Sequence, residues 1–214
     1  VFFLGSLSLS AYSNKTVEGL SDSLIRLHVI ANSDSDEDQE LKRSVRDAVI
    51  KYMEEELKGA ENIDEVKRRI NNDIGRLEEI AAEVVKSCGK DYEVHASIGK
   101  SLFPTKAYGD IVLPAGSYQA LKIVIGEGQG ANWWCVLFPP LCFVDVSHGT
   151  VPDSVKEELK SVLTEEEYKI IDSSEEDEDI PVKIKFKIVE FFQNSEFFEK
   201  SKIKFAAMLK KIFD

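Results

Sequence analysis

The residues of this chain best suited to covalent chemistry lie close together in the second half of the sequence. Cys135 or Cys142 would supply a thiol nucleophile, His148 a general base, and Asp145 a carboxylate that orients the base. Cys142 and Asp145, however, lie in an apolar run, where a cysteine is more often a small buried hydrophobe. No pattern marks an oxyanion hole. We therefore expect no catalytic residues and no enzyme, and keep an exported thiol hydrolase using Cys135 or Cys142 with His148 as the alternative function.

The same two cysteines are also candidates for a disulfide. Pro139 and Pro140 lie between them and favour a tight turn, through a cis bond, that joins two short apolar strands at 135–138 and 141–146. In such a hairpin Cys135 and Cys142 are diagonal neighbours, about 7–8 Å apart. That separation is marginal for a disulfide, so the sequence leaves both the bonded and the free form open.

Metal binding finds little support in the sequence. The acidic run from Asp34 begins like a calcium loop, but Gln39 and Val45 stand where that loop requires glycine and glutamate. These acids are better interpreted as the cap of a helix, because its dipole favours negative charge in the first turn. His28 and His95 have no evident third ligand. We expect neither a metal nor a cofactor.

A glycine-rich loop follows an apolar strand and resembles a phosphate-binding loop. Its glycines are Gly126, Gly128 and Gly130. A dinucleotide fingerprint needs a helix directly after the loop, and the pair Pro139–Pro140 forbids one. The glycines instead indicate a tight loop with positive φ angles. We expect no small-molecule substrate.

Asn132, Trp133 and Trp134 come directly after this loop and are the best candidates for binding a partner. Neighbouring side chains of a strand point to opposite faces, so at most one of the two tryptophan rings is expected in the core. A tryptophan that stays exposed is a good anchor for a protein partner. Arg26 and His28, which share one face of an earlier strand, are a weaker candidate. The three loop glycines complete the predicted partner-binding set.

The elements that position these residues indicate an α+β fold. Alternating apolar residues predict strands at 24–31, 92–98 and 121–125. Spacings of three and four predict two long helices, 36–57 and 62–87, joined as a hairpin. One or two short helices are expected within 153–172. We therefore predict a main domain over 20–171, in which a two-helix hairpin packs on a mainly antiparallel or mixed β-sheet.

The net charge and the two ends of the chain give further predictions. Among 214 residues, 39 are Asp or Glu and 27 are Lys or Arg, for a net charge of −12, which disfavours nucleic acid as a partner. The apolar residues 1–13 are expected to be a truncated signal peptide or an anchor. The acidic run 172–179 is a predicted linker. Residues 180–214 are expected to form a strand, 182–188, and a basic amphipathic helix, 195–213.

Two long strings of residues resemble the stage II sporulation protein R family. The first begins Leu27-His28-Val29-Ile30-Ala31-Asn32-Ser33-Asp34-Ser35 and continues through Val45-Arg46-Asp47-Ala48-Val49. The second lies between Tyr108 and Val146 and includes Gly130-Ala131-Asn132-Trp133-Trp134-Cys135-Val136 and Phe138-Pro139-Pro140-Leu141-Cys142. The resemblance covers roughly 20–150, with a weaker likeness at 182–192. Strings of this length are far more specific than a short motif.

The resemblance implies a function that the residues alone do not indicate. Members of this family are sporulation signalling proteins made in the forespore and secreted across the cytoplasmic membrane into the space between forespore and mother cell. There they bind and activate a membrane-embedded aspartic protease of the mother cell, which triggers pro-sigma-factor processing. No catalytic residues belong to the family's pattern, in keeping with the expectation of a protein that is not an enzyme.

Overall fold

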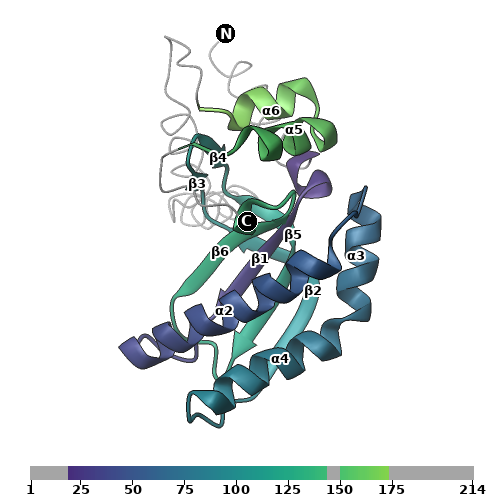
Figure 1. Cartoon of the computed structure of the whole chain (residues 1–214). Helices are drawn as coiled ribbons and strands as arrows, with labels where there is room; N and C mark the ends of the chain where they lie inside the picture. Colours follow the sequence, from purple (N-terminus) through teal and green to yellow (C-terminus); the bar gives the residue numbers. More distant parts are fainter. Residues whose placement is uncertain (1–18, 144–149, 174–214) are drawn as a thin grey trace, which may run out of the picture.

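The computed structural model describes residues 19–143 and 150–173. A mixed four-stranded sheet is covered on one face by three helices, and a smaller group of elements lies at one end of the sheet (Figure 1). The main sheet has the order β2-β5-β1-β6. Its strands are β1 (Ile25–Ile30), β2 (Val94–Phe103), β5 (Gly116–Ile125) and β6 (Asn132–Phe138). The predicted α+β class with a mixed sheet is confirmed.

The central pair of strands, β1 and β5, is parallel, and both outer strands are antiparallel to their neighbours. A parallel pair needs a long crossover. Here the crossover includes the helices α2 (Asp36–Glu56), α3 (Ile63–Asn72) and α4 (Ile74–Ser87). Figure 1 shows α2 and α4 running across the same face of the sheet. The topology therefore explains why the face behind the sheet receives no long helix among the described residues.

The predicted alternation of β1 is confirmed by its two sets of contacts. Ile25, Leu27 and Val29 are fully buried in a core formed with the helices. Arg26 and His28 point to the opposite face of the sheet. Half of the buried residues of the helix-side core are apolar side chains at helical spacing, which are Leu41, Val45, Val49, Met53, Val66, Ile70, Leu77, Ala81 and Val85.

The single long helix predicted at 62–87 is wrong, because the structure divides it into α3 and α4 at Asp73. Asn71, Asn72 and Asp73 are poor helix formers whose side chains compete for backbone hydrogen bonds. The amide of Asp73 still closes α3 by bonding to the carbonyls of Arg69 and Ile70. A hydroxyl from α2, that of Tyr52, reaches the Asp73 carboxylate at 3.2 Å, so the bend is fixed to the neighbouring helix.

A second hydrophobic core lies at the end of the main sheet where α5 and α6 are, on the face away from α2 (Figure 1). It combines a two-stranded sheet, β3 (Lys106–Tyr108) and β4 (Ile111–Leu113), with α5 (Asp153–Val162) and α6 (Glu165–Ile171). The prediction of one or two short helices within 153–172 is confirmed, and there are two. Asp110, in the β3–β4 turn, accepts hydrogen bonds from Lys156 of α5 and from the amide of Val151. This buried ion pair connects α5 to the small sheet.

Other predictions are corrected or fall outside the described residues. The expected strand at 141–146 is wrong at its start, because Leu141–Phe143 is a short 3-10 helix, η1. The expected strand 92–98 begins at Val94 and is longer, ending at Phe103. Residues 1–13, most of the predicted linker 172–179, the predicted strand 182–188 and helix 195–213, and His148 and Asp145 lie outside the described residues. Within residues 19–143 and 150–173, no helix has both the length and the apolar composition to cross a membrane.

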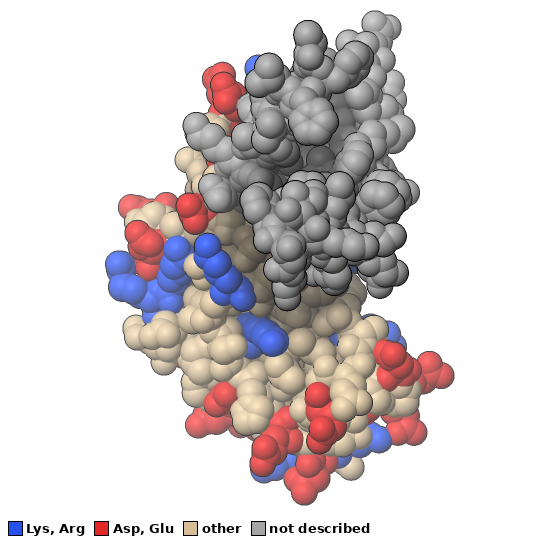
Figure 2. Space-filling model, turned by 180° about the vertical axis from the view of Figure 1, so that it is seen from behind, with Lys and Arg blue, Asp and Glu red and all other residues tan. Residues whose placement is uncertain are grey.

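The surface charge is unevenly distributed over this fold. Seen from behind, acidic side chains gather at the lower end of the molecule and again higher on one side, with basic side chains between them (Figure 2). The helices hold most of the described acids; α2 alone begins with Asp36, Glu37 and Asp38. This separation of charges bears on where an acidic or a basic partner can bind.

Candidate functional site

The two predicted tryptophans lie side by side on the outer strand β6 and point to opposite faces of the sheet. Trp133 is paired with Val29, whose side chain packs under the helices. Trp134 is paired with His28, on the face away from the helices. The alternation of a strand therefore places the two indole rings in different surroundings, as the sequence predicts.

Trp133 is exposed and forms part of an open groove. Its side chain is 36% exposed, and Leu102 is the other exposed large hydrophobic residue described. The guanidinium carbon of Arg46 lies 4.0 Å from the centroid of the Trp133 ring, a cation–π contact. The groove, of about 370 Å³, is lined by Trp133 and Cys142 and by Arg46, Asp47, Ile50, Lys51 and Glu54 of α2. An exposed aromatic ring beside both acidic and basic side chains is suited to binding another protein.

Trp134 instead belongs to an aromatic cluster on the opposite face. Its indole stacks on the imidazole of His28 with centroids 3.9 Å apart, and it lies 4.7 Å from the ring of Phe103. Nε2 of His28 is 2.7 Å from Oδ1 of Asn132. Burial lowers the pKa of His28, and the nearby charges of Lys122 and Arg26 act in the same direction while the Asn132 contact opposes them. The imidazole is therefore neutral at pH 7.

Arg26 lies in the same cluster but is fully buried. Its guanidinium carbon is 4.0 Å from the Phe103 ring centroid and 4.8 Å from that of Tyr118. One nitrogen, Nη2, donates to the hydroxyl of Tyr108 at 2.8 Å. In turn Tyr108 donates to the backbone carbonyl of Trp134 at 3.2 Å. Nε and Nη1 of Arg26 have no hydrogen-bond partner among the described residues, so within this part of the chain the buried cation is held by aromatic rings and not by a carboxylate.

The predicted tight glycine loop is confirmed, and its close packing has a structural purpose. Gly126 and Gly128 have φ angles of 56° and 61°. A Cβ on Gly126 would lie 2.3 Å from Oδ1 of Asn32, and one on Gly130 would lie 2.2 Å from the backbone oxygen of Ser33. The loop thus packs directly against the connection between β1 and α2. Its glycines position the start of β6 and hence Asn132.

Hydrogen bonds hold this junction together. Asn32 donates to the Asp38 carboxylate at 2.8 Å and accepts from the amide of Glu127 at 3.0 Å. The carboxylate of Asp34 accepts from the amide of Ala131 at 2.6 Å. Hydrogen bonds from Ser33 and Asn32 hold the pKa of Asp38 below its usual value, although burial opposes them. The string of residues from Asn32 to Asp38 is therefore a structural junction.

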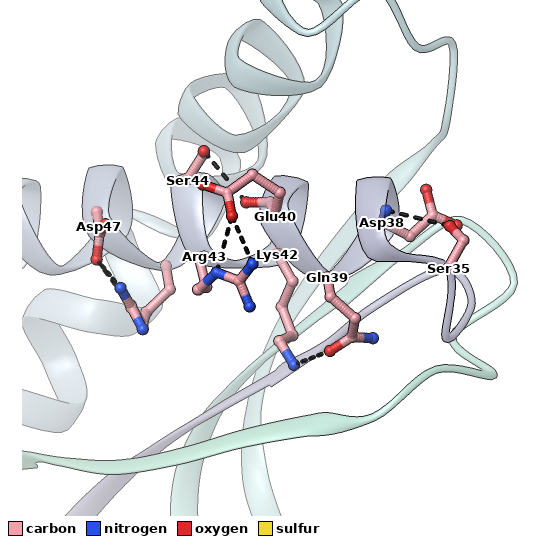
Figure 3. A network of polar contacts seen from close by, with 9 residues as sticks. Ser35, Asp38, Gln39, Glu40, Lys42, Arg43, Ser44 and Asp47 are labelled. Atoms are coloured by element: carbon pink, nitrogen blue, oxygen red, sulfur yellow. Dashed lines mark hydrogen bonds and ion pairs between the residues drawn. The ribbon is translucent and has the colours of Figure 1, made fainter.

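The acidic run also caps α2, as predicted. The hydroxyl of Ser35 accepts from the amide of Asp38 at 3.2 Å, and three acids occupy the first turn. Figure 3 shows this cap and, farther along the helix, Lys42 reaching Gln39. The Nζ of Lys42 also donates to the carbonyl of Ala131 at 2.9 Å. Lys42 thereby ties α2 to the residue that precedes β6.

Cys135 and Cys142 form a disulfide, with Cα atoms 5.6 Å apart. The Phe138–Pro139 bond is cis, which confirms the expected turn, but the chain continues as η1 and not as the second strand of a hairpin. Cys142 therefore lies on a short helix, and its Cα atom is closer to that of Cys135 than in the hairpin expected from the sequence. A sulfur in a disulfide is not the thiolate that a hydrolase requires. The third cysteine, Cys88, is free and exposed.

The structure thus unites four of the predicted partner-binding residues, Arg26, His28, Asn132 and Trp134, in one cluster, and separates Trp133 from them. Sequence reasoning missed Arg46, Phe103 and Lys122. Their neighbours in space are remote in the chain, so no local pattern reveals them. Within the described part of the chain, no group of three or more His, Cys, Asp or Glu side chains is arranged to hold a metal ion.

Comparison with known proteins gives two consistent results. A family model described as stage II sporulation protein R matches residues 21–148. A curated relative, stage II sporulation protein R of Bacillus subtilis (strain 168), is 40% identical over 188 residues, which cover 82% of each chain. No solved structure matches the chain. The family-model match includes the helices α2, α3 and α4, the whole main sheet and the disulfide.

Proposed function

The chain belongs to the stage II sporulation protein R family and so has a role in sporulation, and we propose that it acts there as a secreted signalling protein. Its target in this proposal is a membrane-embedded aspartic protease of the mother cell. Binding would activate the protease, which then processes a pro-sigma factor. The protein would act by contact alone, without a reaction of its own.

The exposed ring of Trp133 is the observation that best supports a protein partner. A monomeric protein gains stability by burying a tryptophan, yet this one is 36% exposed at the outer strand of the sheet. Arg46 covers one part of the ring, and the groove beside it is open. Tryptophan and arginine are the side chains most enriched among residues that dominate binding energy at protein interfaces.

Two further features support action outside the cytoplasm. Residues 1–13 are apolar and uncharged, with small residues near Ala11 and Ser13, as in an export signal. Disulfides such as that between Cys135 and Cys142 persist mainly in oxidising compartments. Secretion into the space between the forespore and the mother cell fits both features.

The alternative of a thiol hydrolase loses its support. Both candidate nucleophiles, Cys135 and Cys142, are joined in the disulfide. Cys135 is also almost completely buried in the helix-side core, out of reach of a substrate. The candidate base, His148, lies outside the described residues. No specific observation therefore favours a catalytic function.

Reconstitution of the candidate protease with its pro-sigma substrate in lipid vesicles tests the proposal. Adding the wild-type protein should raise the rate of substrate cleavage, and the Trp133→Ala variant should fail to do so. Leu102→Ala is the matched control, because Leu102 is equally apolar and more exposed but lies on the opposite edge of the sheet. Equal cleavage with and without the wild-type protein would refute the proposed activation.

A further inference from the structure

The strands carry a charge pattern opposite to that of the chain. The net charge of the chain is −12, yet none of the six strands within residues 19–143 and 150–173 contains an Asp or Glu. Their charged residues are Arg26, Lys100, Lys106 and Lys122, together with two histidines. The sheet therefore presents positive charge in a molecule whose helices carry the acids.

One part of the sheet has no described element packed over it. We call it the open face; it lies away from α2, at the end of the sheet remote from α5 and α6. Its exposed members are His95, Ser97 and Gly99 of β2 and Asn132 of β6, together with the half-buried Lys122 of β5. The stacked rings of His28 and Trp134 border it, where Phe103 and the second core begin. A Cβ built on Gly99 would meet no heavy atom within 4 Å. In Figure 2, which shows the molecule from behind, uncharged and basic side chains occupy the middle of the visible surface, and the acidic side chains gather at its lower end and higher on one side.

The positive charge of the open face is not neutralised within the described residues. Lys122 lies beside His28 in the register of β1 and β5, and no ion pair joins it to a described acid. The guanidinium of Arg26, one pair of residues away, is buried against Phe103 and Tyr118. Two of its nitrogens find no hydrogen-bond partner in the described part of the chain. A buried cation without a counter-ion is costly and produces a strong local field, which an approaching carboxylate would relieve.

The geometry points to a docking surface: we propose that the open face binds an acidic, surface-exposed segment of the protease, with a carboxylate at Lys122 beside the stacked rings of His28 and Trp134. This inference rests on the proposed function. It identifies the chemistry of the partner, which is a carboxylate next to an apolar or aromatic side chain. Trp133 is the neighbouring residue on β6, but its side chain points to the helix-side face. A partner that binds both the open face and Trp133 would therefore contact β6 on both faces of the sheet.

Other occupants fit the surface less well. A membrane with anionic lipids would also be attracted by Lys122, but a bilayer is a broad surface that would also meet the acidic side chains at the lower end of the molecule (Figure 2). A short acidic segment can contact Lys122 without approaching them. A second copy of the chain would bring the same unneutralised lysine against the first in a twofold arrangement. Charge complementarity therefore selects an acidic protein segment.

Two lysines on the strands allow a matched experiment. Lys122 is on the open face, whereas Lys100 follows Ile98 by two residues and so shares the helix-side face of β2. Neither has an ion pair with a described acid. In binding assays on vesicles that contain the protease, Lys122→Glu should weaken binding at least about ten-fold, and the neutral Lys122→Gln by a smaller factor. Lys100→Glu should stay within about two-fold of wild type. Thermal melting of each variant checks that it is folded.

The outcomes separate the two proposals. If the wild-type protein does not bind the protease vesicles, the proposed function fails. If it binds and folded Lys122→Glu binds equally well, the docking inference fails while the proposed function stands. Binding to protease-free vesicles of phosphatidylglycerol that is lost in Lys122→Glu would assign the face to lipid and overturn the inference. So would a wild-type dimer in sedimentation that Lys122→Glu converts to monomers.

Discussion

The imidazole of His28 and the indole of Trp134 are stacked with their planes 24° from parallel, which joins the centre of the sheet to its outer strand. The contact spans 106 positions of the chain, and Phe103 packs against both rings. The next residue toward the N-terminus, Trp133, turns to the opposite face and meets Arg46. Adjacent tryptophans therefore have different physical roles, one in packing and one at the surface.

We predict that the two tryptophan-to-alanine variants fail in different ways. Trp134→Ala removes the stack with His28 and the contact with Phe103, so its free energy of unfolding should fall by about 3 kcal/mol. Trp133→Ala loses an exposed ring and one cation–π contact, which should cost no more than about 1 kcal/mol. Its affinity for the protease should fall by about 2 kcal/mol or more. Melting curves and protease activation, measured on both proteins, distinguish the two effects.

If both variants melt at low temperature, Trp133 is structural and the anchor lies elsewhere. Val124→Ala is a useful reference, since this half-buried residue of β5 has neither ring contact. A Trp133→Phe variant should restore part of the binding, because an aromatic face remains for Arg46 and the partner.

We predict that glycine-to-alanine changes at Gly130 and Gly99 differ strongly. A Cβ at position 130 would lie 2.2 Å from the Ser33 oxygen and 2.9 Å from the Cβ of Ala31, so the loop must move away from the β1–α2 connection. Unfolding free energy should fall by about 2 kcal/mol or more. Gly99 has open space, and Gly99→Ala should change stability by less than about 1 kcal/mol. Chemical denaturation of both variants provides the comparison, and equal stabilities would contradict the packed junction.

The sequence predicts local elements well where one face is apolar. Strand 24–31 and helix 36–57 agree with the structure to within a residue or two, because each has a clear period and capping residues. The prediction of one helix at 62–87 is wrong at Asp73, where the structure divides it in two. The apolar spacing continues across this break, so the hydrophobic pattern does not indicate it. The strand predicted from Leu141 fails because a short apolar run fits a strand and a 3-10 turn equally well.

The candidate site is predicted in its residues but not in its arrangement. Periodicity places Arg26 and His28 on one strand face, yet it does not indicate that Arg26 is fully buried. That burial depends on Phe103, Tyr108 and Tyr118, which are more than seventy positions away. Similarly, the cysteine pair depends on how the chain leaves β6 after the prolines. Contacts between remote parts of a chain leave no local pattern in a single sequence.

We predict that reduction of the disulfide weakens the fold and the groove together. The bond between Cys135 and Cys142 closes a short loop and holds η1 against the sheet beside α2. Loss of a short-loop disulfide typically costs about 2–3 kcal/mol. The double variant Cys135→Ala with Cys142→Ala should therefore melt lower than wild type, and reductant should lower the melting temperature of wild type only. If reductant lowers both equally, the bond does not contribute to stability.

Cys88→Ala is the control for that experiment, because Cys88 is free and exposed and should melt like wild type. Signalling by the folded double variant is informative as well. A hydrolase acting through either sulfur would lose all activity in that variant at any temperature. A binding protein should keep protease activation at temperatures at which the variant remains folded.

We predict that the ion pair between Asp110 and Lys156 makes stability depend on pH in acid. Burial by itself would raise the pKa of Asp110, but hydrogen bonds from Lys156 and the Val151 amide outweigh it and hold the pKa below its usual value. The folded state therefore binds a proton at Asp110 less readily than the unfolded state. The resulting stability is fully present above the ordinary pKa of an aspartate, near 4, and is lost as pH falls through the lowered pKa of the folded state.

The variant Lys156→Met tests this linkage directly. At pH 7 it leaves the Asp110 carboxylate buried without its cation, so unfolding free energy should fall by about 3 kcal/mol. At a low pH, below the lowered pKa of Asp110 in the folded wild type, the carboxylate is protonated in both proteins, and the difference from wild type should shrink to about 1 kcal/mol. Lys160→Met is the control, since Lys160 is half exposed in its pair with Glu157 and should cost under about 1 kcal/mol at either pH. A Lys156→Met deficit that is equally large at both pH values would mean that the side chain acts through packing, and that the charge of Asp110 does not secure α5 to the small sheet.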